Sequence, residues 1–133
     1  MLQSITLTAE FDELPKLAAW VEAQAPQFAL DARQLYAIQL CVEEVAANLV
    51  MHARRAGQGA AHFTVALEAD PLRVTVEDDG PAFDPTKAPL PKGPATLESV
   101  GSGGLGLELV SGFASLRDYA RVSGKNRLTL GFG

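Results

Sequence analysis

Cysteine and histidine are scarce in this chain of 133 residues, which contains one cysteine, Cys41, and two histidines. A lone cysteine cannot form an internal disulfide bond, so a small secreted scaffold held together by disulfides is excluded. Two histidines and one cysteine also cannot fill the usual four-ligand zinc set without several carboxylates. We therefore expect no structural metal ion.

Positive charge and long apolar runs are also lacking. Eleven lysines and arginines stand against sixteen aspartates and glutamates, which gives a net charge of −5. This is the wrong sign for a protein that neutralises nucleic-acid phosphates. The first residues lack the basic and apolar regions of a signal peptide, and no apolar run approaches the roughly 20 residues that span a bilayer. We expect a cytoplasmic protein that binds neither nucleic acid nor a membrane.

The hydrophobic content, in contrast, is ample for a folded core. With 47% hydrophobic and 20% charged residues, the chain has the composition of one globular domain over residues 1–133. Alternation of apolar and polar side chains predicts a strand over residues 3–9. Apolar residues at helical spacing predict a helix over 11–25, which must end near Pro26.

The second predicted helix has the clearest start signal in the chain. Asp31 occupies the N-cap position with Gln34 three residues later, and Leu30 and Leu35 stand where a hydrophobic staple would place them. The helix should continue until it frays around residues 54–59.

The rest of the chain is predicted to contain two hairpins separated by a long loop. Alternating apolar residues predict a hairpin over 63–76 and a closing hairpin over 119–132, turned at Gly124-Lys125. Between them, residues 80–106 hold five of the eight prolines and six of the twelve glycines. This composition resists helix and sheet, and so long a loop in a small domain is usually functional. A third helix should follow Gly106.

Asp78 is the first candidate functional residue. Strand parity places it on the same face as Val74 and Val76, which should be buried, and an unpaired carboxylate there would cost several kcal/mol. In one interpretation the strand has already ended and Asp78 caps a turn into Gly80. In the other, Asp78 lies at the floor of a pocket and accepts a hydrogen bond from a ligand, while Gly80 lets the backbone approach that ligand closely.

The second candidate is a polar ridge on the long helix, formed by Glu44, Asn48 and His52 at spacings of four. It could be a solvated helix face. However, asparagine is a poor residue for a helix interior because its amide competes with the backbone. An amide oxygen is a suitable ligand for Mg²⁺, and a carboxylate one turn earlier could deprotonate a nucleophile.

The third candidate is the glycine-rich segment 101–106 (GSGGLG), directly before the predicted third helix. Exposed backbone N–H groups at a helix start suit a phosphate group. The segment satisfies the spacing G-x-G-x-x-G, but a dinucleotide site would need a strand directly before it, and a proline-rich loop stands there instead. A flexible hinge is the alternative interpretation, and it is compatible with phosphate binding.

Together, these features occur in a specific order: a helix with Glu44 and Asn48, a strand ending in Asp78-x-Gly80, a long loop, and a glycine-rich segment that opens a helix. This order resembles the Bergerat-fold (GHKL) ATP-binding domain shared by gyrase, the heat-shock chaperone, MutL-type repair proteins and histidine kinases. Within that superfamily the chain is similar to the stand-alone anti-sigma-factor serine/threonine kinases of bacteria. The resemblance covers nearly the whole chain and rests on the runs 44–53 (EVAANLVMHA), 83–85 (FDP), 103–110 (GGLGLELV) and 126–130 (NRLTL).

The resemblance implies an α/β (α+β) two-layer sandwich, in which a mixed, mainly antiparallel sheet carries about three helices on one face. ATP or ADP would lie between those helices and the loop 80–106, which would act as a lid. The kinases of this branch phosphorylate a serine on a small anti-anti-sigma (STAS-type) partner, and the balance of partners decides whether a sigma factor is sequestered. Homodimerisation through the sheet is also implied.

Site residues are implied by the same resemblance. Glu44 would be the general base toward the attacking hydroxyl, and Asn48 would coordinate the Mg²⁺ that bridges the phosphates. Asp78 would accept a hydrogen bond from the adenine amino group, and Gly80 would let the ring pass. The phosphates would be held by the glycine-rich segment, through Gly103, Gly104, Leu105 and Gly106.

Many relatives place a threonine beside the adenine. Parity with Leu128 and Leu130 points here to Asn126 instead, and it turns Thr129 to the opposite face. We therefore expect Asn126 to belong to the nucleotide site.

The chain departs from the family pattern in its lid. Some relatives use a lid arginine to stabilise charge on the transferred phosphate, but residues 80–106 contain no arginine. Lys87 or Lys92 could substitute as a point charge without bidentate geometry. Two further interpretations remain open beside the kinase: a nucleotide-gated regulator that binds a protein without transferring phosphate, and a structural domain in which Glu44 and Asn48 are surface residues.

Overall fold

The fold is an α+β sandwich with a single sheet, seen here in a computed structural model that describes residues 1–56, 62–82 and 114–132. The elements are β1 (Leu2–Thr8), a 3-10 turn η1 (Phe11–Glu13), α1 (Leu14–Gln24), α2 (Ala32–Ala56), β2 (His62–Glu68), β3 (Arg73–Asp78), β4 (Leu116–Val122) and β5 (Lys125–Gly131). The predicted elements within the described residues are therefore confirmed, with boundaries shifted by a few residues.

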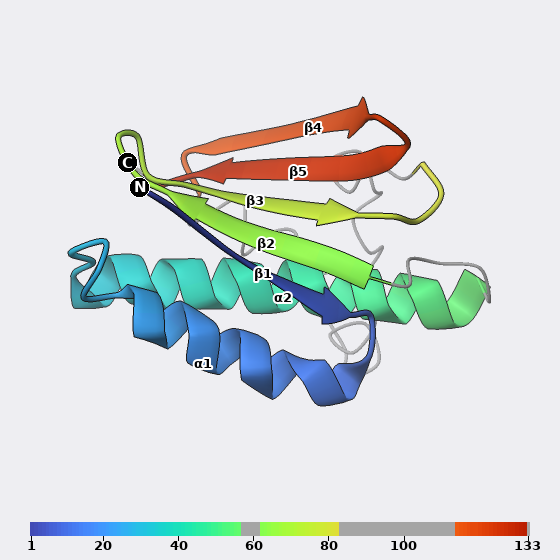
Figure 1. Cartoon of the computed structure of the whole chain (residues 1–133), viewed down its shortest axis with the longest axis horizontal. Coiled ribbons are helices and arrows are strands. Elements are labelled where there is room, and N and C mark those ends of the chain that lie inside the picture. The colour runs from blue at the N-terminus through green and yellow to red at the C-terminus, as the bar shows by residue number, and fades with distance from the viewer. Residues whose placement is uncertain (57–61, 83–113, 133) are drawn as a thin grey trace, which may run out of the picture.

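The sheet has the strand order β1-β2-β3-β5-β4, and each neighbouring pair is antiparallel. Figure 1 shows α1 and α2 on one face of this sheet, where α1 packs against β1 and α2 against β3. The expected two-layer architecture with a mainly antiparallel sheet is thus confirmed. The predicted third helix after Gly106 and the loop from residue 83 onward lie outside the described residues and stay predictions.

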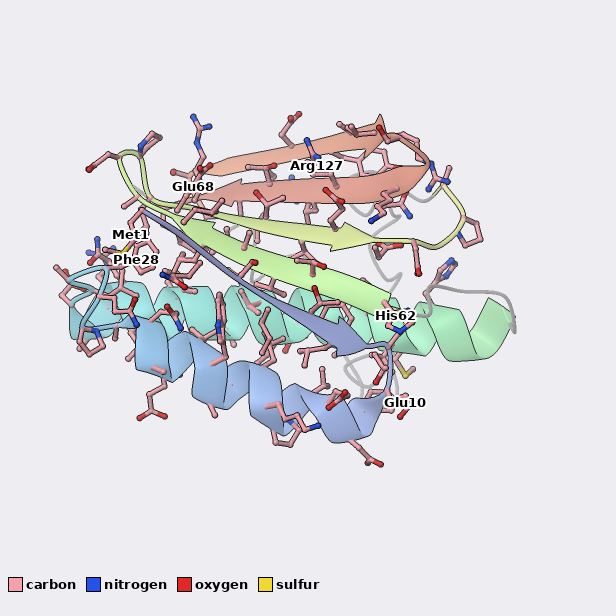
Figure 2. All side chains as sticks on the ribbon, viewed as in Figure 1. Met1, Glu10, Phe28, His62, Glu68 and Arg127 are labelled. Carbon is pink, nitrogen blue, oxygen red and sulfur yellow. The ribbon has the colours of Figure 1, made fainter. Side chains whose placement is uncertain are left out.

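Apolar side chains fill the layer between the sheet and the two helices (Figure 2). They arise from the two periodicities read in the sequence, because alternate strand residues and one stripe of each helix face the same layer. Burial is close to complete at the centre, which includes Leu17, Val21, Ile38, Val42, Phe63, Val65, Leu67, Val74 and Leu130.

The start of α2 has the capping arrangement that the sequence predicts. The backbone N–H of Gln34 donates to Oδ1 of Asp31 at 2.8 Å, and the backbone N–H of Asp31 donates to Oε1 of Gln34 at 3.0 Å. Two N–H groups that would lack partners at a helix start are thereby satisfied reciprocally. The staple residues Leu30 and Leu35 are partly buried against the core. This cap fixes where α2 begins, and therefore which of its residues face the sheet.

The closing hairpin turns one residue earlier than predicted. Ser123 and Gly124 are its central residues, with φ values of 53° and 77°, and Lys125 is already the first residue of β5. A two-residue hairpin turn of this hand requires positive φ at both central positions, which glycine adopts without steric cost. This shift of the turn by one residue leaves Asn126 on the predicted face of the sheet.

No helix in the part of the chain that the structure describes combines the length and the apolar character needed to cross a bilayer.

Candidate functional site

One row of paired residues across the sheet changes from apolar to polar. From β1 to β4, the row consists of Leu7, Phe63, Asp78, Asn126 and Arg121, which are register partners. Its side chains point to the helix side of the sheet, because Leu7 and Phe63 belong to the buried core. The second half of α2 lies at the same end of the molecule as the carboxyl end of β3, where this row crosses (Figure 1). This end of the sandwich is the candidate site.

Asp78 lies on the core face of β3 and also caps the turn, while its contact with a ligand stays a prediction. It is the last residue of β3, half-buried, and on the same face as Val74 and Val76. It also caps the turn, since the backbone N–H of Gly80 donates to its Oδ1 at 2.9 Å. Oδ1 accepts a second hydrogen bond from Nδ2 of Asn126 at 3.0 Å. Among the described residues, Oδ2 has no hydrogen-bond partner, so it remains available to a ligand.

Asn126 is the most buried polar residue of the site, with 6% of its surface exposed. Its amide nitrogen donates to Asp78 and also to the carbonyl oxygen of Pro81 at 2.8 Å. Its amide oxygen accepts a hydrogen bond from the hydroxyl of Tyr119. Both partners of the nitrogen are acceptors, so a flipped amide would bring oxygen against oxygen. The predicted parity is confirmed, because Asn126 pairs with Asp78 while Thr129 lies on the opposite face, paired with Thr75. That Asn126 belongs to a nucleotide site stays a prediction.

The turn that follows β3 is held from both sides. On the β2 side, Oδ1 of Asp79 accepts a hydrogen bond from the backbone N–H of His62 at 3.1 Å, and Oδ2 lies 3.7 Å from Nδ1 of the same residue. His62 opens β2 at this end of the sheet (Figure 2). On the β4 side, Nη1 of Arg121 donates to the carbonyl oxygen of Gly80 at 2.8 Å. Gly80 itself is buried. The turn is therefore held by contacts from β2 and β4, in addition to the hydrogen bond from Asn126 of β5 to Pro81.

The helix side of the site carries the polar ridge predicted on α2. Glu44, Asn48 and His52 are each half-buried, which places the ridge at the border of the core rather than on a fully solvated face. Among the described residues, the side chains of Glu44 and Asn48 form no hydrogen bond and no ion pair. A half-buried carboxylate and amide one helical turn apart, without partners of their own, can both serve a ligand.

Cys41 lies one turn before Glu44 and is completely buried. Burial, and secondarily the negative charge of Glu44, raise the pKa of the thiol to about 11. The thiol is therefore protonated at neutral pH and cannot act as a nucleophile. Its side chain packs in the core.

The donor set fits a nucleotide with Mg²⁺ better than a metal held by the protein alone. Within the described residues, no three His, Cys, Asp or Glu side chains gather in a way that could hold a metal ion. Magnesium usually takes only one or two protein oxygens and completes its octahedron with phosphate oxygens and water. The amide oxygen of Asn48 suits that role, and the open Oδ2 of Asp78 suits an amino group.

Several predicted site residues lie outside the described part of the chain. These are the four phosphate-binding candidates Gly103, Gly104, Leu105 and Gly106, together with the two lysines Lys87 and Lys92. Their assignment stays a prediction from the sequence.

Two residues of the site were missed by sequence reasoning. Tyr119 and Arg121 read as ordinary members of an amphipathic strand, yet both contact the turn or its buried asparagine. They are two residues apart and therefore lie on one face of β4, the face that pairs with Leu128 and Asn126. This spacing is the sequence signal that pointed to them. Identifying them required the register of β4 on β5.

Comparison with known proteins agrees with this architecture. Residues 7–132 match the family described as the histidine kinase-like ATPase domain. The chain is 34% identical over 128 residues to the serine/threonine-protein kinase BtrW of Bordetella bronchiseptica, covering 96% of this chain and 87% of that protein. A crystal structure of the RsbU and RsbW domains of a protein from Mycobacterium tuberculosis superimposes with a TM-score of 0.65 at 18% identity. That likeness covers 99% of this chain but only 32% of the other, and it concerns the fold alone.

Proposed function

This chain belongs to the histidine kinase-like ATPase domain family, and from that premise we propose that it is an ATP- and Mg²⁺-dependent serine/threonine kinase. Its substrate in this proposal is a small anti-anti-sigma protein of the STAS type, and its regulatory target is a sigma factor. The protein would act in the cytoplasm by partner switching. The 34% identity to a serine/threonine-protein kinase supports this choice over other activities of the same fold.

The observation that carries the proposal is the environment of Asp78. A carboxylate on the core face of a strand needs compensation, and only Oδ1 receives it from the described residues, through Gly80 and Asn126. An adenine amino group would supply the donor for Oδ2. Gly80 next to it has no side chain that would keep a flat base away from the backbone.

The proposed roles of the other residues follow from their chemistry. Glu44, half-buried and without a partner among the described residues, would take the proton from the serine hydroxyl that attacks. Asn48, one turn later, would hold Mg²⁺ through its amide oxygen, and the bound ion would neutralise charge on the phosphates. Gly103, Gly104, Leu105 and Gly106 would hold the phosphates.

The proposal is tested by mixing the protein with an anti-anti-sigma protein from the same organism, ATP and Mg²⁺, and weighing the intact partner. We expect a mass gain of one phosphoryl group that is lost when Mg²⁺ is removed with a chelator. ADP at about 100 times its dissociation constant should also stabilise the fold by about 2.7 kcal/mol, read as a rise in the unfolding temperature. Absence of both effects would refute nucleotide-dependent function altogether.

A second function is favoured by one sequence feature, the absence of arginine from residues 80–106. An arginine at the transferred phosphate typically contributes much of the catalysis in phosphoryl transfer. Without it, the protein would be a nucleotide-gated regulator that binds its partner and transfers nothing. Partner binding that depends on nucleotide, with no change in the partner's mass, would select this alternative.

We also propose that the chain forms a homodimer through the face of the sheet opposite α1 and α2. No described helix covers that face, and its centre carries small side chains on adjacent strands, namely Ser4, Ala66 and Thr75 in register. Such a surface permits close approach of a second sheet. Ala66→Arg should convert the dimer into a monomer in analytical ultracentrifugation. A wild-type protein that sediments as a monomer at high concentration would contradict the proposal.

A further inference from the structure

The two carboxylate oxygens of Asp78 differ in their hydrogen bonding. Oδ1 accepts from two protein donors, the N–H of Gly80 and the amide of Asn126, and these fill its ordinary capacity of two. Oδ2 has no partner among the described residues. The orientation of the carboxylate is therefore set by the protein before any ligand arrives.

The two donors to Oδ1 are themselves held by β4. The Tyr119 hydroxyl donates to the buried amide oxygen of Asn126, and the Arg121 guanidinium donates to the carbonyl oxygen of Gly80. Tyr119 and Arg121 lie two residues apart on the same face of β4, where they pair with Leu128 and Asn126. One strand thus supports both hydrogen bonds that orient Asp78.

We propose that Tyr119 and Arg121 are positioning residues that determine base specificity, by keeping Oδ1 of Asp78 occupied and presenting Oδ2 alone to the base. This inference rests on the proposed nucleotide-binding function and adds to it how the site discriminates between two purine bases. A fixed acceptor favours a purine with an amino group at C6 over one with a carbonyl oxygen there, because two acceptors facing each other repel. The site is therefore selective for adenine over hypoxanthine.

The supporting residues are needed because a carboxylate rotates readily about its terminal torsion. If the hydroxyl of Tyr119 is removed, the buried oxygen of Asn126 loses this donor, and the amide is held less firmly in its present orientation. Oδ1 of Asp78 then loses one of its two donors. Either oxygen is an acceptor, but a carboxylate that turns no longer holds one oxygen at the distance and angle that the C6 amino group requires, so the discrimination against a C6 carbonyl weakens.

The test compares ADP with inosine diphosphate, which differs at C6 of the base, by isothermal titration calorimetry on the full chain. We expect the wild type to prefer ADP. Tyr119→Phe should reduce that preference by about threefold to tenfold, the range expected for one hydrogen bond. Asp118→Asn is the matched control, because Asp118 is exposed on the opposite face of β4. It should leave the preference unchanged.

Arg121 is tested separately, and its variants keep the inference falsifiable if Tyr119→Phe should fail to fold. Arg121→Met removes the donor to Gly80 and should lower the preference for ADP, while Arg121→Lys retains a donor and should restore most of it. Arg117→Met is the control, since Arg117 is exposed on the same face of β4 and makes no hydrogen bond or ion pair within the described residues. The Gly80 amide resonance in a ¹⁵N-edited NMR spectrum should shift in Arg121→Met but not in Arg117→Met.

The possible outcomes distinguish a failure of the proposed nucleotide-binding function from a failure of the positioning role of Tyr119 and Arg121. If the wild type binds neither diphosphate, the proposed function fails and this inference falls with it. If the wild type prefers ADP and folded Tyr119 and Arg121 variants keep that preference, the proposed function survives and the positioning role is overturned. Variants that lose affinity for both nucleotides equally would also overturn it, because they reveal a purely structural role.

Discussion

Replacing Glu44 with glutamine should reduce phosphoryl transfer to the proposed anti-anti-sigma partner by about 10²-fold to 10⁴-fold, the usual contribution of a general base. Glutamine keeps the size of the side chain and its place on α2 but cannot accept the proton of the attacking serine. The rate is measured from the mass of the intact partner over time. ADP affinity should change little, because Glu44 is assigned to the hydroxyl and not to the nucleotide.

Glu43→Gln is the matched control for this experiment. Glu43 is the preceding residue of α2 and is exposed, whereas Glu44 is half-buried at the border of the core. The two substitutions remove the same charge from adjacent positions. Equal rates in both variants would exclude Glu44 as the base, and a selective loss in Glu44→Gln with intact ADP binding would support the kinase over the nucleotide-gated regulator.

Asp78→Asn should weaken ADP binding by about tenfold to hundredfold, which corresponds to the loss of a hydrogen bond to a charged group. Asparagine can keep the oxygen that accepts from Gly80 and Asn126 and replaces only Oδ2, which becomes an amino group. That donor would face the amino group of adenine. The same donor suits the C6 carbonyl of inosine diphosphate, so calorimetry should show the preference between the two diphosphates inverted.

Glu77→Gln is the control for Asp78→Asn. Glu77 is the neighbouring residue of β3 but lies on the opposite face, where its carboxylate contacts Arg127 at 3.0 Å and Lys125 at 3.8 Å. Removing this charge should cost at most a small amount of stability, as is usual for partly exposed ion pairs, and should leave nucleotide binding intact. If Asp78→Asn binds ADP as tightly as Glu77→Gln does, the base does not lie at Asp78.

Helical and strand periodicity determined the elements of the described part of the chain. The capping residues Asp31 and Gln34 located the start of α2, and the hydrogen bonds between them show why, since a helix start must satisfy its own N–H groups locally. Strand parity alone placed Asp78 and Asn126 on the buried face. These features depend on neighbours in sequence, so the sequence contains them directly.

The turn of the closing hairpin was predicted less accurately than the helices and strands. Several adjacent residues, Ser123, Gly124 and Lys125, are compatible with a turn, and the prediction was wrong by one position. The choice between them depends on which residues can take positive φ while the strands keep their pairing. Similarly, the order of motifs indicated the family, but it could not indicate which residues support Asp78.

The sequence by itself determined the family, the two described helices, the parity of the strands and the choice of Glu44, Asn48, Asp78 and Asn126 as candidate site residues. Tertiary structure alone decided that Tyr119 and Arg121 belong to the same site. Those two residues lie about forty positions after Asp78 and reach it only because β5 pairs with β3 on one side and with β4 on the other. Long-range pairing is set by the closure of the whole sheet over its core, and no local pattern encodes it.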